Sequence, residues 1–264
     1  MSENTSEAAG QTRKGRDLRV LALLACRNEM RYLPGYFANV SAQVDGVIAL
    51  DDGSTDGSAD FIAAQAATLE LIRLPSQEPH HWDEPRNRRL LIEAAGRHGA
   101  DWVLALDADE RIERGFRPRA EAVIAEGQAS ATMAFAIRFR ELWDAPDQYR
   151  ADGMWDRKVQ ARLFKIRPDA VLDDRGLHGH WAPLNSKSAT GFPQVDLWLY
   201  HLRMIDAADR RARQARYQQL DPERRWQAIG YDYLTDENNL LLARIPEGRE
   251  YEPMAVLVRD AGNR

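Results

Sequence analysis

Residues 46–58 read Gly46-Val47-Ile48-Ala49-Leu50-Asp51-Asp52-Gly53-Ser54-Thr55-Asp56-Gly57-Ser58, an apolar run that stops abruptly in acidic and small residues. It is the second of four comparable runs, and the others cover residues 18–25, 69–74 and 102–106. Short, almost fully apolar runs are typical of strands that are buried on both faces of a parallel sheet. Because a helical or loop segment follows each run, the pattern predicts an α/β protein with a doubly wound, mostly parallel sheet.

The composition is that of a folded protein with a mild negative charge. The 264 residues are 44% hydrophobic and 29% charged, and 36 Lys and Arg stand against 41 Asp and Glu, which gives a net charge of −5. That balance disfavours a polynucleotide partner, whose phosphates require a basic surface. The single cysteine, Cys26, can form no internal disulfide, and no apolar run has the length of a leader or a transmembrane segment. We therefore expect a cytoplasmic protein with no transmembrane segment.

Two acidic clusters follow two of the predicted strands. Asp51-Asp52 closes the second run, and Asp107-Ala108-Asp109-Glu110 closes the fourth. Each cluster alone is compatible with a turn, because Asp, Gly and Ser favour turns. At the carboxyl edge of one open α/β sheet, however, both would meet where ligands bind, and the carboxylates would repel one another unless a cation offset them. Mg²⁺ and Mn²⁺ bind carboxylate oxygens together with substrate phosphates, so the D-x-D pattern predicts a divalent ion that holds a diphosphate.

Four motifs give the chain a resemblance to a known family. They are Asn28-Glu29, the D-D-G-S-T-D of residues 51–56, Arg86-Asn87 and Asp107-Ala108-Asp109. In this order and approximate spacing they resemble the family-2 glycosyltransferases with the GT-A fold, over about residues 18–140. The resemblance implies a metal-dependent enzyme that moves a sugar from a nucleotide-diphosphate sugar to an unknown acceptor, with Mn²⁺ or Mg²⁺ as cofactor. It favours an inverting transfer, while a retaining one stays open.

Carried over residue by residue, the resemblance implies a donor site. Glu29 and Asp52 would bind the nucleoside, and Arg86 and Asn87 would lie near the base or the diphosphate. The family usually has Ala before the Arg-Asn pair, where this chain has Pro85, and that change removes no functional group.

The same resemblance places Asp107 near the ribose or the metal, and Asp109 on the metal. His201, in an apolar segment, is the first choice for a further metal ligand, because an imidazole nitrogen can join carboxylate oxygens on manganese. His180 is the second choice, since the neighbouring Gly179 gives the chain close access to a ligand. The competing interpretation of both histidines is an ordinary surface or core residue.

The catalytic base is the least defined part of the predicted site. An inverting transfer needs a group that deprotonates the acceptor hydroxyl. Related enzymes often carry His-Glu where this chain has His178-Gly179, so an expected carboxylate is missing. Asp174 and His178 are the candidate catalytic residues, Asp174 by its location alone.

We predict one domain in two parts behind a tail. Residues 1–17 lack an apolar period and would form a mobile tail. Residues 18–140 would form the nucleotide-sugar-binding half, and residues 141–264 an acceptor-side lobe that ends in helices. Further strands are predicted at 132–139, 159–166 and 195–204, and helices at 206–220 and 222–243.

Three questions stay open at this point. The arginine-rich stretch of residues 210–225 is either a solvated face or a contact to an anionic acceptor, such as a phosphorylated sugar or a lipid head group at a membrane surface. The D-x-D pattern after an apolar strand also describes an aspartyl phosphotransferase. The missing base is compatible with a non-catalytic nucleotide-binding module.

Overall fold

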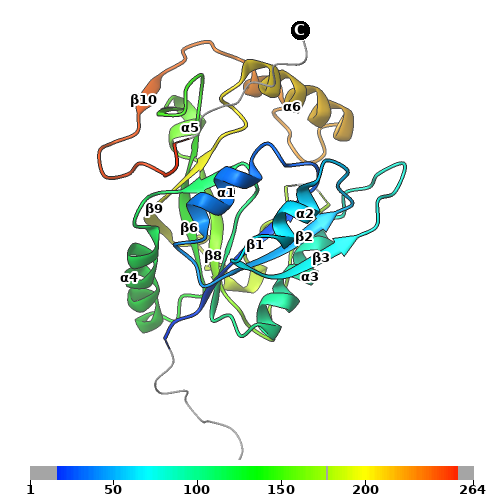
Figure 1. Cartoon of the computed structure of the whole chain (residues 1–264). Coiled ribbons are helices and arrows are strands. Elements are labelled where there is room, and N and C mark those ends of the chain that lie inside the picture. The colour runs from blue at the N-terminus through cyan, green and yellow to red at the C-terminus, as the bar shows by residue number, and fades with distance from the viewer. Residues whose placement is uncertain (1–16, 177, 255–264) are drawn as a thin grey trace, which may run out of the picture.

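The computed structural model describes residues 17–176 and 178–254, so residues 1–16 of the predicted tail lie outside the described residues. Within those ranges the chain forms an eight-stranded sheet, in the order β3-β2-β1-β4-β8-β6-β9-β5, and a small sheet of β10 and β7 (Figure 1). The strands are β1 (Val20–Cys26), β2 (Val47–Asp52), β3 (Thr68–Leu74), β4 (Trp102–Ala105), β5 (Glu110–Ile112), β6 (Ala134–Glu141), β7 (Gln148–Arg150), β8 (Val159–Lys165), β9 (Gln194–His201) and β10 (Leu242–Arg244). The helices are α1 (Leu33–Val40), α2 (Ser58–Ala63), α3 (Glu84–Arg97), α4 (Phe116–Ala129), α5 (Gly153–Asp156) and α6 (Ala207–Leu220), with 3₁₀ turns η1 (Leu184–Ser186) and η2 (Asp232–Leu234).

The four strands predicted from the N-terminal apolar runs form the parallel half of the large sheet. β1 lies between β2 and β4, β3 flanks β2, and all three pairings are parallel. The pairing of β6 with β9 is also parallel, whereas β8 is antiparallel to both neighbours and β5 is antiparallel to β9. Four of the seven strand pairings are therefore parallel, which confirms the predicted α/β class with a mostly parallel sheet.

Helices cover both faces of this sheet because side chains alternate along β1. Ala22 and Leu24 point into a core that includes α1 and α4. Leu21 and Leu23 point into a second core that includes the apolar face of α3. All four side chains are fully buried, so the first apolar run behaves as a central strand is expected to behave.

The three later strands predicted from sequence are found as β6, β8 and β9, but the predicted helix at 222–243 is wrong. In its place the structure has turns, the 3₁₀ turn η2 and the strand β10. Pro222 cannot continue α6, Gly230 has a φ of 74° and Arg224 a φ of 54°, both in the left-handed region. The Asp221 side chain accepts hydrogen bonds from the backbone N–H groups of residues 225–227, which fixes a turn where a helix was expected. Of the predicted C-terminal helices, only α6 is present among the described residues.

Candidate active site

The parallel strands bring three loops to one edge of the sheet. Cys26 at the end of β1 pairs with Asp51 of β2, and Leu23 of β1 pairs with Ala105 of β4. The segments that leave β1, β2 and β4 therefore lie side by side, as expected for the carboxyl edge of an open α/β sheet. The residues of all four sequence motifs lie at or beside this edge.

The loops after β1 and β2 are joined by hydrogen bonds between side chains of one loop and backbone N–H groups of the other. The Asn28 side chain accepts from the N–H of Thr55 at 2.8 Å, and the Ser58 hydroxyl accepts from the N–H of Glu29 at 3.0 Å. Asp51 accepts from the N–H of Ser54 at 3.0 Å. These contacts hold the turn that follows β2 and fix the position of Glu29 in the loop after β1. The role of Asp51 is therefore to stabilise the local backbone.

A second set of contacts gathers three of the predicted donor-binding residues. The buried Asp52 carboxylate accepts hydrogen bonds from the Arg86 guanidinium at 3.1 Å and from the Asn87 amide at 3.2 Å. Arg86 and Asn87 lie in the first turn of α3, which is capped by the Asp83 side chain. A ring nitrogen of His80 lies 3.3 Å from the same carboxylate, and no motif in the sequence pointed to it.

The D-x-D motif and the first motif meet through an arginine. The Arg203 guanidinium donates to Asp109 at 2.5 Å and to both carboxylate oxygens of Glu29 at 2.5 and 2.6 Å. Burial opposes the ionisation of Asp109, but the positive charges of Arg203 and His201 outweigh it and hold the pKa of Asp109 well below its ordinary range. Burial raises the pKa of Glu29 to about 7, although Arg203 favours the ionised form. Arg203 was not singled out by the sequence, since it lies 174 residues from Glu29 in the chain.

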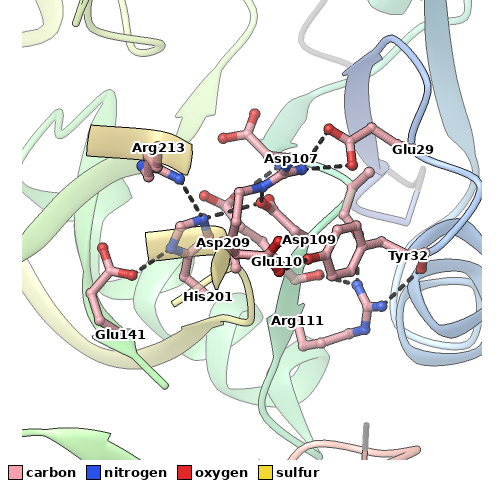
Figure 2. Close-up of polar contacts among 12 residues, drawn as sticks. Glu29, Tyr32, Asp107, Asp109, Glu110, Arg111, Glu141, His201, Asp209 and Arg213 are labelled. Atoms are coloured by element: carbon pink, nitrogen blue, oxygen red, sulfur yellow. Dashed lines mark hydrogen bonds and ion pairs between the residues drawn. The ribbon is translucent and has the colours of Figure 1, made fainter. Parts of the chain in front are cut away.

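His201 lies between two carboxylates at the end of β9. Its Nε2 atom is 3.2 Å from Asp109, and its Nδ1 atom hydrogen-bonds Glu141, as Figure 2 shows. Burial disfavours the charged imidazole, but the two carboxylates outweigh burial and raise the pKa of His201 to about 9. Arg213 also approaches Nε2, at 3.2 Å. Nε2 cannot donate to Asp109 and accept from Arg213 at once, and the two carboxylates favour the protonated ring that donates to both.

The first carboxylate of the D-x-D motif has a different partner. Asp107 accepts a hydrogen bond from the Arg162 guanidinium at 3.0 Å, and the same nitrogen donates to the fully buried Glu110 at 2.6 Å. Burial is the main cause that raises the pKa of Glu110, to about 8. The Asp107 side chain is 45% exposed, so it is open to a ligand while Arg162 orients it.

A cavity of about 680 Å³ opens beside Asp107, between the sheet and the C-terminal part of the chain. Its volume is in the range of small-molecule binding sites. Of the predicted site residues, Asn87, Asp107, His178, His180 and His201 line it. Aromatic side chains and cations contribute much of the remaining wall, namely Trp82, Phe139, Trp155, Trp181, Phe192, Tyr217, Tyr233, Arg88, Lys158, Arg162 and Arg213.

The remaining predicted residues lie on the loop after β8. The His178 ring lies 3.2 Å from the Tyr231 hydroxyl, and its pKa is lowered by burial and by nearby cations. His180 packs its ring against Phe192. Asp174 is exposed and does not line the cavity. In the described part of the chain His201, and not His180, contacts Asp109.

The arginine-rich stretch divides into different environments. Arg210 is buried and ion-paired with Asp144 at 2.9 Å and Glu237 at 3.1 Å, so it stabilises the fold. Arg213, three residues later, lines the cavity. Arg216 and several neighbours are exposed to solvent.

A family model for glycosyl transferase family 2 matches residues 22–181, which is more than half of the chain. The chain belongs to glycosyl transferase family 2. The matched segment of this family 2 chain begins within β1 and contains β2 to β4, both acidic clusters and the loop of His178 and His180. The resemblance predicted from the four motifs is thereby confirmed, and with it the GT-A type of α/β fold.

Two curated relatives of this family 2 chain are the uncharacterized proteins Mb3815c of Mycobacterium bovis and Rv3786c of Mycobacterium tuberculosis. Each is 26% identical over 238 residues, an alignment that covers 86% of this chain and 58% of the relative. The chain therefore spans less than two thirds of the length of these relatives.

Solved structures also resemble this family 2 chain. Staphylococcus aureus TarS has a TM-score of 0.49 at 12% identity, covering 80% of this chain and 44% of TarS. Glucosyl-3-phosphoglycerate synthase from Mycobacterium tuberculosis, solved with Mn²⁺ and UDP-glucose, has a TM-score of 0.36 at 19% identity, covering 47% of this chain and 44% of the synthase. Among the helices in the described ranges, none combines the length and the apolar character that crossing a bilayer requires.

Proposed function

We propose that this chain transfers a sugar, with inversion, from a nucleotide-diphosphate sugar to an acceptor hydroxyl, in a reaction that depends on Mn²⁺ or Mg²⁺. The observation that carries the proposal is the meeting of Asp109, His201 and Glu29 at one sheet edge, beside the Asp52 cluster and a cavity. Residues 18–140 would hold the donor, and residues 141–264 would complete the acceptor side.

The Asp52 cluster suits the nucleoside end of the donor. Asp52 is a buried acceptor, while the Arg86 side chain is 37% exposed and offers further N–H groups. A nucleobase or ribose hydroxyl donates to a carboxylate, and a phosphate accepts from a guanidinium. We therefore place the nucleoside near Asp52 and Glu29, with Arg86 and Asn87 toward the base or the diphosphate.

The donor atoms around Asp109 fit a divalent cation. An ionised carboxylate and an imidazole nitrogen face each other 3.2 Å apart, and the Glu141 carboxylate holds the other nitrogen of that imidazole. A carboxylate behind a ligating histidine is a common arrangement at metal sites, because it orients the ring and raises its basicity. No cluster of three or more His, Cys, Asp or Glu suited to a metal occurs in residues 17–176 and 178–254. A bound ion would displace the proton from Nε2 of His201, so that Asp109 and His201 would be the protein ligands, and substrate phosphates and water would complete the coordination.

When bound, such an ion supplies positive charge that stabilises the departing diphosphate. Arg203 holds the charges of Glu29 and Asp109 together, and its guanidinium lies where it can also contact a phosphate. Asp107, oriented by Arg162, lines the cavity as His201 does and would meet the ribose or the sugar.

An anionic acceptor is supported by Arg213. Its guanidinium lines the cavity, and no carboxylate of the described residues lies within ion-pair distance of it. A phosphate or carboxylate on the acceptor would pair with this guanidinium directly, in addition to the longer-range attraction of Glu141 and Asp109.

The proposal is tested with a panel of sugar nucleotides, incubated with Mn²⁺ or with EDTA, by measuring the release of nucleoside diphosphate. We expect at least one donor to be hydrolysed with Mn²⁺ and not with EDTA. Binding without turnover would support the non-catalytic module, and release of phosphate from simple esters would support the aspartyl phosphotransferase.

A further inference from the structure

Four carboxylates line the cavity, and Glu84 is the one with the weakest ion pair. Asp107 and Glu110 share Arg162 at 3.0 and 2.6 Å, and Glu141 is paired with Lys158 and His201. The closest cation to Glu84 is Arg88, at 3.5 Å. Glu84 is thus the cavity carboxylate whose oxygens are least committed to protein partners.

Arg88, the ion-pair partner of Glu84, is held in place by contacts with other residues. Arg88 is buried, donates to the backbone carbonyl of Asp173 at 2.6 Å and lies over the Trp181 ring at 5.6 Å. It can stay in place while Glu84 changes its protonation state. Gly179 lines the cavity beside Glu84, and its backbone N–H favours the ionised form of the Glu84 carboxyl.

The surroundings of Glu84 prepare it to exchange a proton near neutral pH. Burial is the largest influence and raises its pKa to about 7, and the charge of Asp107 acts in the same direction. Arg88, Arg162 and the N–H of Gly179 oppose the rise. A general base works best when its pKa lies near the operating pH.

We propose that Glu84 is the general base that deprotonates the acceptor hydroxyl. The proposal rests on the proposed function and on its inverting course. The acceptor oxygen forms a bond to the anomeric carbon of the donor sugar, while the bond from that carbon to the diphosphate breaks. The electron pair of the broken bond leaves with the diphosphate, and the hydroxyl proton passes to the Glu84 carboxylate.

Glu84 is better placed for this role than the two bases predicted from sequence. Asp174 lies outside the cavity lining. His178 lines the cavity, but its Nε2 atom lies 3.2 Å from the Tyr231 hydroxyl and its ring packs against Tyr217. A ring held between two tyrosines has one nitrogen in use and less freedom to meet a hydroxyl.

The test follows the pH dependence of nucleoside diphosphate release by the full chain with Mn²⁺, using whichever sugar nucleotide the panel shows to be hydrolysed. For the wild type, kcat rises with pH to a plateau with an apparent pKa near 7. Glu84→Gln lowers the plateau by about 10²–10⁴-fold and removes this rise, while binding of UDP or GDP, measured by calorimetry, is unchanged. Glu93→Gln, on the exposed face of the same helix, is the matched control and behaves as the wild type.

A second variant, Glu84→Asp, distinguishes loss of the base from loss of the fold. Glu84→Asp keeps a carboxylate but withdraws it by one methylene group, so it is slower than the wild type yet still gains rate as pH rises. The inference is overturned if Glu84→Gln retains the wild-type plateau and pH dependence, or if His178→Gln and not Glu84→Gln removes the rise. If the wild type hydrolyses no sugar nucleotide, the proposed function itself fails, which is a different result from an active Glu84→Gln variant.

Discussion

Arg203 offers the sharpest perturbation of the site, because one guanidinium neutralises two carboxylates from distant parts of the chain. We expect Arg203→Met to destabilise the protein and to make its stability respond more strongly to Mn²⁺. Methionine keeps a long apolar side chain beside the Tyr32 ring, which the guanidinium now covers at 5.1 Å. The change thus removes the charge with little loss of packing.

The expected loss of stability in Arg203→Met depends on how far its ion pairs are exposed to solvent. Removing one partner of a fully buried ion pair costs about 3–5 kcal/mol, whereas an exposed pair contributes less than about 1 kcal/mol. The Arg203 side chain is 30% exposed, while Asp109 is 6% exposed. We expect an intermediate loss of about 2–3 kcal/mol, which lowers Tm by roughly 4–12 °C in a chain of this size.

The assay is thermal unfolding with EDTA and with Mn²⁺. In the wild type a divalent cation competes with Arg203 for Asp109, and in Arg203→Met that competitor is gone. Saturation to 100 times Kd stabilises a folded protein by about 2.7 kcal/mol, so Mn²⁺ should recover most of the loss in the variant and raise Tm less in the wild type. Arg31→Met is the matched control, since Arg31 lies over the same Tyr32 ring at 5.2 Å but pairs with Asp209 at the surface.

Two results would refute this reasoning. One is a loss of Tm in Arg203→Met no larger than that in Arg31→Met. The other is an equal rise of Tm with Mn²⁺ in the wild type and in Arg203→Met.

Two further predictions concern the loop behind the cavity and the core of the sheet. Asp173 is buried and accepts hydrogen bonds from Arg175 and from the N–H of His180, and the Arg175 hydrogen bond holds its pKa below the ordinary range. Asp173→Asn should cost about 1–3 kcal/mol above pH ~4, and the difference from the wild type should vanish as the pH falls further, because the wild-type carboxyl is then protonated too. Urea unfolding as a function of pH checks this, and an equal difference at every pH would contradict it. Leu23 is fully buried in β1, so Leu23→Ala should cost about 2–5 kcal/mol in the same assay, and a loss below roughly 1 kcal/mol would show that β1 is not central to the core.

The parts of the molecule that could be predicted from sequence are those with local signals. The apolar runs fixed β1 to β4, and parallel pairing then placed the acidic clusters at one edge. Asp52, Arg86 and Asn87 were named by the family resemblance, and the structure brings them together because Arg86 and Asn87 occupy the first turn of the helix after β3.

The parts that could not be predicted depend on partners far apart in the chain. Arg203 lies 94 residues from Asp109, Arg162 lies 55 residues from Asp107, and Glu141 lies 60 residues from His201. Nothing in the spacing of such residues shows that the parallel β6–β9 pairing and the antiparallel β4–β8 and β5–β9 pairings bring them together. His80 and Glu84 were not singled out, since His80 lies in a polar loop and Glu84 precedes the Arg86-Asn87 motif without being part of it.

Two of the differences between predicted and observed secondary structure have local causes. The short strands β5, β7 and β10 contain three residues each, too few for a periodic pattern. The segment 222–243 has helix-forming residues, but Pro222, Gly230 and the Asp221 side chain favour turns.

The most direct test of the central claim is a calorimetric titration of UDP and GDP into the wild type and into Asp109→Asn, each with Mn²⁺ and with EDTA. The account predicts that at least one nucleotide binds the wild type with Mn²⁺, and that EDTA or Asp109→Asn weakens this binding by about tenfold or more. Equal affinity with and without the chelator, in both proteins, would contradict the claim that Asp109 and a divalent cation hold the diphosphate.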